Sequence, residues 1–461
     1  MNQPLRLRPH LPNWKITVGV LMLSVYGCRT NNQDAVTPIA DPKDASSFSA
    51  DVATKWADMD LKLIRASAGF TPPVAARALG YAGLAMYEAA APGITGNRSL
   101  GGQLNKLAVL PKTTTDSSYH WAASVNAAQA EIARGIWANT TDAMKKKIDS
   151  LETVFETDYR KNATKAEIDR SVAFGKSIAV AIFEWSKTDG GHEGYLRNFP
   201  ASYKSPVFPG SWQPTENGRK IPMQPFWGNN RLFVVNNTIL PPPPPLNVST
   251  SPSSDYFKQY QSVYFKNKSL TQTEKEISIW WADDPSETFT PPGHSYNLAK
   301  IAVETANAKL DKAVEAFART GLAVTDAFTL CWKCKFTFSN ERPYTFVRRA
   351  IDPTWVPFWP APPFPGYTSG HATQSSATAT VLTAVFGEKF AFTDNSHVGR
   401  IRDTKRGIDF KARSYQSFAE SAEESALSRF LGGIHTMQDN NMGLAEGKKI
   451  GANINALRWK K

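Results

Sequence analysis

Apolar residues recur at helical spacing along most of this chain of 461 residues. Between residues 51 and 68 they fall near one side of a helix, which is the pattern of an amphipathic helix packed on a core. A second helix begins at Pro72-Pro73, because proline is tolerated in a first helical turn. Alternation with a period of two, which marks a half-buried strand, is scarce. The pattern predicts an all-α protein.

We expect helices over residues 51–68, 72–91, 120–138, 143–159, 165–187, 255–266, 270–282, 295–310, 311–334, 417–431 and 441–457. A further helix opens at His371, and its small side chains permit close packing against a neighbouring helix. Residues 395–414 are a polar excursion, in which His397 is expected to be an exposed loop residue.

Two helical bundles are expected on either side of a segment rich in proline and glycine. Residues 49–190 form the N-terminal bundle and residues 251–461 the C-terminal one. The segment between them, residues 191–250, either wraps one bundle or links the two. A disordered linker is disfavoured, because its apolar side chains are costly to leave in water. These side chains are Trp212, Phe226, Trp227, Phe233 and Val234.

The first 28 residues have the pattern of a lipoprotein-type signal peptide. Three basic residues precede an apolar run from Ile16 to Tyr26, which is too short to cross a bilayer as a mature helix. The run ends in Val-Tyr-Gly-Cys, which is similar to a lipobox, so Cys28 is the predicted lipidated residue. The alternative is an ordinary signal peptide cut nearby. Residues 29–48 then form a flexible tether, and the mature protein is expected to be exported, as a periplasmic or outer-membrane-attached lipoprotein of the cell envelope.

The charge balance favours attraction of anions. The formal net charge is +12, and removing the three basic residues before Cys28 leaves +9. The basic residues are spread among acids without a basic run or an RNA-binding signature, which argues against nucleic-acid binding.

The chain has only three cysteines, and two of them form a C-x-x-C pair, Cys331 and Cys334. In an exported protein such a pair is a candidate disulfide. A thioredoxin-like site would need a strand–helix setting, and two cysteines without matching histidines are poor evidence for zinc. We therefore favour a buried helical position for Cys331 and leave the disulfide open.

Three short clusters in the last third of the chain carry the candidate chemistry. Together they supply three permanent cations, two imidazoles, a hydroxyl and a carboxylate. The clusters are Lys335 with Arg342, then Thr368-Ser369-Gly370-His371, then Ser428-Arg429 with His435 and Asp439. Arginine offers a planar fork of donors and lysine a compact charge, a combination that suits a tetrahedral or trigonal-bipyramidal oxyanion.

The remaining groups of the clusters also suit an oxyanion. A Ser-Gly-His turn at a helix start adds backbone N–H groups and the positive end of the helix dipole. One histidine can bond the central atom, while the other exchanges a proton with an apical oxygen. Asp439 lies four residues after His435, so on a helix it is placed to orient that ring.

The three clusters, in this order, resemble the signature shared by type-2 phosphatidic acid phosphatases, bacterial class A acid phosphatases and vanadium-dependent haloperoxidases. The runs CWKCKFTFSNERPYTFVRRAIDP, PPFPGYTSGHAT and SRFLGGIH are most similar to the bacterial, Bacteroidetes-like haloperoxidase branch, which includes iodide-oxidising enzymes. The likeness is loose over residues 50–461 and close over residues 325–455. Most relatives outside that branch have proline where this chain has Thr368, and threonine also fits a helix entry.

The resemblance implies a vanadate cofactor and a haloperoxidase reaction, in which hydrogen peroxide oxidises a halide to hypohalous acid. It implies that His435 is the axial vanadium ligand and that His371, His435, Lys335 and Asp439 are catalytic. The implied cofactor-binding residues are Lys335, Arg342, Ser369, Gly370, His371, Arg429 and His435. The implied partners are peroxide and halide, with an organic acceptor left open and membrane contact only through the lipid anchor. Residues 251–461 would then be the catalytic bundle.

Residues around the clusters take implied roles with structural alternatives. By position, Trp332 and Phe364 line the halide pocket of chloroperoxidases, and ordinary core packing is the alternative. In haloperoxidases a carboxylate upstream of the lysine pairs with the arginine of the third cluster. Asp283 or Asp284 is therefore a candidate to pair with Arg429 from behind the cofactor-binding residues. A turn or cap acid is equally compatible. His294 either supports the cofactor-binding residues from behind or, as we favour, orders a turn.

Two other functions remain open. The main alternative is an exported acid phosphatase of the same superfamily, in which His435 attacks phosphorus and forms a phosphohistidine intermediate. Chain length, the extra N-terminal bundle and the Trp332–Phe364 pair favour the peroxidase. The absence of a later apolar run long enough to cross a bilayer argues against the integral-membrane lipid phosphatases. A non-enzymatic lipoprotein scaffold is disfavoured because every chemical position is intact. Among halides the bacterial resemblance favours iodide, with bromide or chloride also open.

Overall fold

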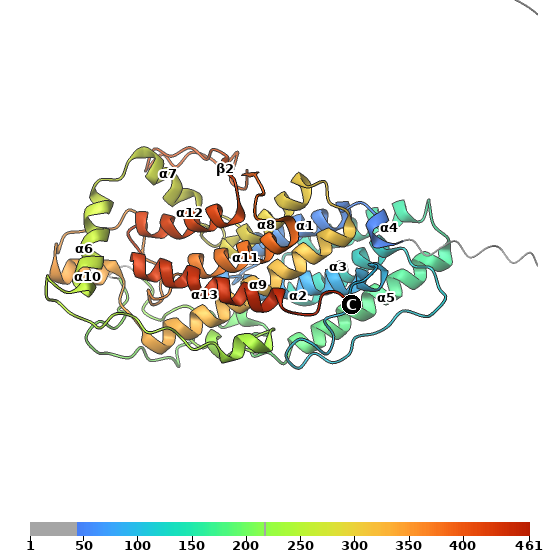
Figure 1. Cartoon of the computed structure of the whole chain (residues 1–461), viewed down its shortest axis with the longest axis horizontal. Helices are drawn as coiled ribbons and strands as arrows, with labels where there is room; N and C mark the ends of the chain where they lie inside the picture. Colours follow the sequence, from blue (N-terminus) through green and yellow to red (C-terminus); the bar gives the residue numbers. More distant parts are fainter. Residues whose placement is uncertain (1–43, 216–217) are drawn as a thin grey trace, which may run out of the picture. The chain divides into compact units, whose positions relative to one another are not determined.

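The computed structural model describes residues 44–215 and 218–461. These residues form thirteen α-helices, five short 3-10 helices and one two-stranded sheet, so the predicted all-α class is confirmed. The helices are α1 (Asp51–Ala66), α2 (Pro72–Ala90), α3 (Trp121–Ile136), α4 (Asp142–Tyr159), α5 (Lys165–Ser186), α6 (Asp255–Lys268), α7 (Gln272–Trp280), α8 (Thr290–Thr305), α9 (Leu310–Phe338), α10 (Pro343–Ala350), α11 (Gly370–Phe386), α12 (Phe418–Leu431) and α13 (Met437–Asn455). Figure 1 shows α9, α11, α12 and α13 side by side.

The predicted signal peptide, its lipidated Cys28 and most of the predicted tether lie outside the described residues. Within the described part of the chain, no helix combines the length and the apolar content needed to cross a bilayer.

Helix α8 begins earlier than its sequence pattern indicates. We expected a helix from residue 295, but α8 starts at Thr290 with Pro291 and Pro292 in its first turn, where proline loses no intrahelical hydrogen bond. His294 therefore lies inside a helix and is fully buried, so the expectation that it orders a turn was wrong.

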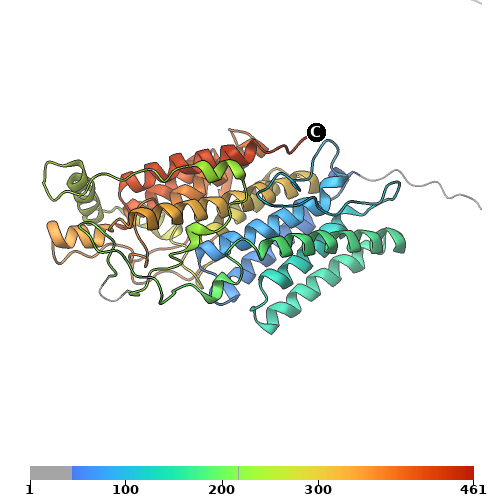
Figure 2. The same ribbon diagram turned by 90° about the horizontal axis from the view of Figure 1, so that it is seen from below.

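The approach of α13 to α11 depends on glycine. A Cβ atom on Gly447 would lie 2.2 Å from the carbonyl oxygen of Thr373, and one on Gly451 would lie 2.8 Å from that of Ala377. No real side chain tolerates these distances, so only glycine lets the two backbones come this close. The two ribbons run side by side in Figures 1 and 2. This contact fixes the first half of α11 against the second half of α13.

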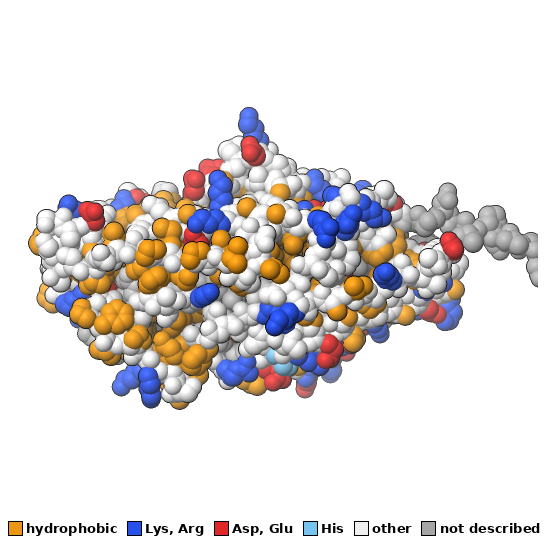
Figure 3. Space-filling view, turned by 60° about the horizontal axis from the view of Figure 1, so that its bottom comes forward, with side chains coloured by type: hydrophobic (Ala, Val, Ile, Leu, Met, Phe, Trp, Pro, Cys, Tyr) orange, Lys and Arg blue, Asp and Glu red, His pale blue; other side chains and the backbone are white. Residues whose placement is uncertain are grey.

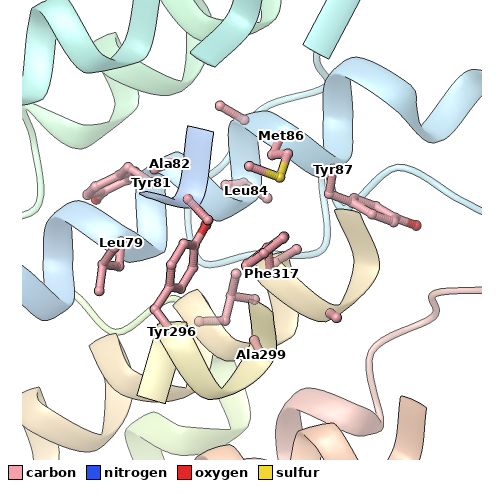
Figure 4. Packing of buried hydrophobic residues seen from close by; sticks show 14 of the residues in the cluster. Leu79, Tyr81, Ala82, Leu84, Met86, Tyr87, Tyr296, Ala299 and Phe317 are labelled. Atoms are coloured by element: carbon pink, nitrogen blue, oxygen red, sulfur yellow. The ribbon is translucent and has the colours of Figure 1, made fainter. Parts of the chain in front are cut away.

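Helix α9 joins the N-terminal helices to the C-terminal ones. Figure 4 shows side chains of α2, α8 and α9 meeting, among them Leu84, Tyr296 and Phe317. A Cβ atom on Gly321 of α9 would lie 2.5 Å from the carbonyl oxygen of Leu79 on α2, so this contact also requires glycine. One buried apolar cluster extends from Ala45 to Trp459, and the described residues form one compact unit. The boundaries at residues 190 and 250 stay predictions.

The segment from 191 to 250 lacks regular structure apart from three 3-10 helices, η3 (Gly194–Leu196), η4 (Trp227–Asn229) and η5 (Val235–Ile239), in its described residues. Its backbone is fastened to α9 through Asp326, which accepts hydrogen bonds from the N–H groups of Phe233 (2.7 Å) and Val234 (3.1 Å). Trp212, Trp227, Phe233 and Val234 are buried as expected. Phe226 is 49% exposed, so its expected burial was wrong, because its ring lies against Tyr203 at the surface.

The polar excursion is closed by a small antiparallel sheet, in which β1 (Phe392–Asp394) pairs with β2 (Arg413–Tyr415). His397 follows β1 and is only 2% exposed, so the expectation of an exposed loop residue was wrong. Its ring stacks on Phe289 and its Nε2 lies 2.9 Å from an oxygen of Asp283, contacts that polar composition does not reveal.

Cys331 and Cys334 are buried on α9 and both are free, so they form no disulfide. The helical, buried position expected for Cys331 is confirmed. Burial raises the pKa of the Cys334 thiol to about 12. Over the face of the molecule in Figure 3, Lys and Arg side chains are scattered between apolar ones.

Candidate active site

Lys335 lies in the last turn of α9 and is completely buried. Its Nζ donates to the carbonyl oxygens of Pro365 (2.9 Å), Gly366 (2.7 Å) and Thr368 (2.5 Å). Burial lowers the pKa of Lys335 to about 8. The extended segment before α11 is thus held by the lysine, and the ammonium group lies next to the start of that helix.

Arg342 precedes α10, a short helix that the sequence pattern did not predict. Its Nε donates to the carbonyl oxygen of Phe364 (2.9 Å), and its Nη1 donates to that of Ile434 (2.8 Å) and lies 3.1 Å from Nε2 of His435. Burial lowers the pKa of Arg342 to about 9. The first and third clusters therefore meet at Arg342 and His435.

His435 is oriented from behind by Asp439, in the first turn of α13. Nδ1 of His435 lies 2.9 Å from Oδ2 of Asp439, which also accepts from the backbone N–H of Thr436 (3.1 Å). Because a carboxylate accepts, Nδ1 carries the proton and Nε2 keeps its lone pair. Burial and the neighbouring cations Arg342, Lys335 and Arg429 hold the pKa of His435 well below its usual range.

The second cluster sits at the N-terminus of α11. Ser369 caps this helix by accepting from the N–H of Ala372 (3.4 Å), and its own N–H donates to the carbonyl oxygen of Asp439 (3.0 Å). Nε2 of His371 donates to the carbonyl oxygen of Trp281 (2.8 Å). Desolvation and Arg429 lower the pKa of His371, so the ring is neutral, and its Nδ1 is the proton acceptor.

Arg429, near the end of α12, shares its acceptor with His371. Its Nη1 donates to the same carbonyl oxygen of Trp281 (3.1 Å). Burial lowers the pKa of Arg429 to about 10, opposed mainly by Asp284. Among the described residues the Nε of Arg429 has no hydrogen-bond partner, which leaves one buried donor for a bound anion.

The two acidic candidates upstream take different places. Asp284 lies in the electrostatic field of Arg429, while burial raises its pKa to about 6. Asp283 instead contacts two histidines: its Oδ2 lies 2.7 Å from Nδ1 of His294 and its Oδ1 lies 2.9 Å from Nε2 of His397. No hydrogen bond joins either described carboxylate to the Arg429 guanidinium.

The two aromatic candidates lie together beside Lys335. The ring centroids of Trp332 and Phe364 are 5.0 Å apart, and Nζ of Lys335 lies 5.9 Å from the first centroid and 5.3 Å from the second. Trp332 is buried, whereas Phe364 and His371 are partly exposed. Access to the buried cations is therefore from the side of Phe364 and His371.

The site as a whole is a buried cationic cage. Lys335, Arg342 and Arg429 are at most 4% exposed, and the acidic groups that act on them are Asp439, Asp284 and Asp283. Asp283 is already shared with two histidines, so burying three cations here is costly unless an anion joins them. The residue types and the unpartnered Nε therefore fit an oxyanion such as vanadate or phosphate.

Sequence reasoning missed the groups that hold the cage together. The carbonyl oxygens of Trp281, Pro365 and Gly366 accept from the cations or from His371, and a backbone carbonyl leaves no sequence signature. Asp394 and His397 were also missed, because they follow His294 by about a hundred positions and only the fold brings them to it.

Comparison with known proteins finds likenesses to vanadium haloperoxidases. Residues 315–458 match the family model of the VCPO second helical-bundle domain. The vanadium chloroperoxidase of Curvularia inaequalis is 29% identical over 262 residues, which are 46% of this chain and 42% of that protein. The chain thus matches less than half the length of this relative.

Two solved structures extend the likeness across the chain. The crystal structure of the first bacterial vanadium-dependent iodoperoxidase has a TM-score of 0.77 and 29% identity, covering 88% of this chain and 96% of that one. The holo-type bacterial vanadium-dependent chloroperoxidase has a TM-score of 0.63 at 15% identity, covering 85% and 92%, and shows the fold alone.

Helical bundles enclosing a buried cage of one lysine, two arginines and two histidines define a class of oxyanion-binding bundle proteins. Within that class, the matched bundle domain and the likeness to the iodoperoxidase point to the vanadium haloperoxidases. The chain is similar to them in sequence over part of its length and in fold over most of it.

Proposed function

We propose that this protein is a vanadate-dependent haloperoxidase, which uses hydrogen peroxide to oxidise a halide to hypohalous acid. The observation that carries the proposal is the meeting of Arg342 and His435 at 3.1 Å inside a cage of buried cations. The second histidine, His371, is attached to the same cage through Trp281. The likeness to the bacterial iodoperoxidase supports the proposal.

The residues of the cage fit vanadate. Arg342 and Arg429 offer charged donors to its oxygens, Lys335 adds a positive charge beside them, and the Ser369 hydroxyl and Gly370 N–H at the start of α11 add neutral donors. His435 would supply the Nε2 lone pair as a ligand, since Asp439 fixes the proton on Nδ1. When bound, vanadate supplies a Lewis-acidic centre that activates peroxide without a change of oxidation state.

His371 handles the proton. Its tautomer is set by the bond from Nε2 to the Trp281 carbonyl, which leaves Nδ1 as the acceptor. The ring is neutral and partly exposed, so it accepts a proton from incoming peroxide and returns it to a leaving oxygen. The buried cations stabilise the negative charge that develops as this proton leaves.

We further propose that iodide is the preferred halide. The rings of Trp332 and Phe364 stand beside the Lys335 ammonium group, so a large, weakly hydrated anion finds aromatic rings and a positive charge together. The name of the iodoperoxidase relative points the same way.

One assay tests the proposal against its alternative. Apo-protein is given vanadate, peroxide and iodide, and in parallel a phosphate ester without vanadate. Iodide oxidation that depends on added vanadate is the expected result. Ester hydrolysis without iodide oxidation would contradict it and assign a phosphatase, in which His435 attacks phosphorus.

A further inference from the structure

Four buried side chains form a cluster behind the cage: Asp283, His294, Asp394 and His397. They are at most 2% exposed. Nδ1 of His294 lies 2.7 Å from Oδ2 of Asp283, and Nε2 lies 2.8 Å from Oδ2 of Asp394. Each ring nitrogen faces a carboxylate oxygen, which only accepts, so both nitrogens carry protons. His294 is therefore an imidazolium cation enclosed by two anions.

The two carboxylates are held in place by other donors. Asp394 accepts from Nε1 of Trp280 (2.7 Å) and, through its other oxygen, from the backbone N–H of Ser396 (2.9 Å). The second oxygen of Asp283 faces Nε2 of His397 (2.9 Å). Although burial opposes the charge, Asp283 and Asp394 raise the pKa of His294 to about 10, in agreement with the geometry.

The imidazolium is joined to the cage through Trp281. The His294 ring stacks on the Trp281 ring with centroids 4.4 Å apart and planes 19° apart, and a cation on an indole face is attractive. Nε1 of Trp281 donates to Glu424 (3.0 Å), which fixes the other edge of the indole. The carbonyl oxygen of the same residue accepts from both His371 and Arg429.

We propose that His294 is a positioning residue of the oxyanion site, acting as a buried cation that holds Trp281 so that its carbonyl oxygen orients His371 and Arg429 together. The proposal rests on the proposed function only in requiring that the cage binds an oxyanion. Whether a halide is then oxidised is a separate question, so binding and spectroscopic measurements separate the two.

The test compares His294→Gln with His397→Gln in the full-length protein. Both residues are buried and both contact Asp283, but His397 packs on Phe289 and Trp280, not on Trp281. Vanadate and phosphate binding to the apo-proteins is measured by calorimetry, and thermal unfolding is measured beside it. We expect binding to weaken about ten-fold or more in His294→Gln and about two-fold or less in His397→Gln, at similar losses of thermal stability.

Nitrogen-15 NMR of the histidine rings reports their protonation state and tautomer, which a loss of stability alone does not change. The wild-type spectrum should show two protonated nitrogens on His294 and a neutral, Nε2-protonated His371. In His294→Gln the His371 resonances should shift, and in His397→Gln they should stay. If His294→Gln does not fold, Asp394→Asn takes its place, since it removes one of the two anions that keep the ring charged.

Three results would overturn the proposal. The first is a neutral His294 in the wild-type spectrum. The second is equal loss of oxyanion binding in the two glutamine variants. The third concerns a metal, because Asp283, His294 and His397 lie close enough together to hold one. Elemental analysis that finds one divalent metal per chain, lost in both variants, would assign a metal site in place of the imidazolium.

Discussion

Asp439 holds His435 by a 2.9 Å hydrogen bond to Nδ1, one helical turn away along the chain. The same carboxylate caps α13 through Thr436, so the start of the helix and the orientation of the imidazole are fixed by one group. The ring can therefore present Nε2 toward Arg342 without a further partner to set its tautomer.

Asp439→Asn tests this orientation. An amide oxygen can replace the cap, but it is a weaker acceptor for Nδ1–H and allows the ring to change tautomer. We expect vanadate affinity to fall about 10- to 100-fold, as for other groups that orient a metal-binding histidine. Calorimetry on apo-protein measures the change. Unchanged affinity, with thermal stability also unchanged, would show that the ring is set by other contacts.

Oxyanion binding should weaken as pH rises through about 8, because burial lowers the pKa of Lys335 to that value and its charge is then lost. Molybdate is a suitable probe, since it does not titrate in this range. Lys335→Met should bind more weakly at pH 7 and lack this inflection. A wild-type affinity that stays flat up to pH 9 would contradict the assignment.

The same lysine makes the stability of the apo-protein depend on pH. The pKa of Lys335 in the folded chain is below its ordinary value, so between about 8 and 10.5 the unfolded chain binds the extra proton. The contribution of this residue to the free energy of unfolding therefore rises with pH across that window. Urea titrations of wild type and Lys335→Met at several pH values should show a steeper rise in the wild type.

Gly447→Ala should destabilise the protein, since the new methyl group would lie 2.2 Å from the Thr373 carbonyl oxygen and force α13 away from α11. We expect a loss of about 1–3 kcal/mol in the free energy of unfolding and weaker vanadate binding. Lys448→Ala, at the exposed neighbouring position, is the control and should change stability by less than about 0.5 kcal/mol. Equal effects of the two substitutions would refute the close packing.

Phe364→Ala should affect the halide more than the cofactor. The ring packs on Trp332 beside Lys335, so its loss opens the proposed halide pocket. We expect kcat/KM for iodide to fall about ten-fold or more, with vanadate affinity changed much less. The control is Phe336→Ala, which removes the same type of side chain from a position beside Tyr203. A larger loss of vanadate affinity than of kcat/KM for iodide would show that Phe364 supports the cofactor and not the halide.

The helices and the chemistry of the cage could both be predicted from the sequence, for different reasons. Helix α5, for example, begins at Lys165 as its periodicity predicts, because Thr164 provides a capping side chain. Lys335, Arg342 and His435 carry charges and imidazoles whose types identify an oxyanion site before their positions are known. Local pattern sufficed in both cases.

What the sequence could not show depends on contacts between distant segments. The sequence pattern predicted a helix only from residue 295, whereas Pro291 and Pro292 form the first turn of α8. His397 lies in a polar stretch, yet packing on Phe289 buries it. The shared acceptor of His371 and Arg429 is a main-chain oxygen, for which any residue type would serve.

The free thiols of Cys331 and Cys334 are sites at which oxidation would damage the protein. Both lie on α9 within the turns that lead to Lys335, so in the proposed reaction an oxidant would form close to two oxidisable sulfur atoms. Hypohalous acids react fastest with thiolates, and burial keeps the Cys334 sulfur protonated at neutral pH. Tight packing around α9 therefore protects these thiols from oxidation. A substitution that loosened this packing would shorten the time for which the protein stays active before it lowered the initial rate of turnover.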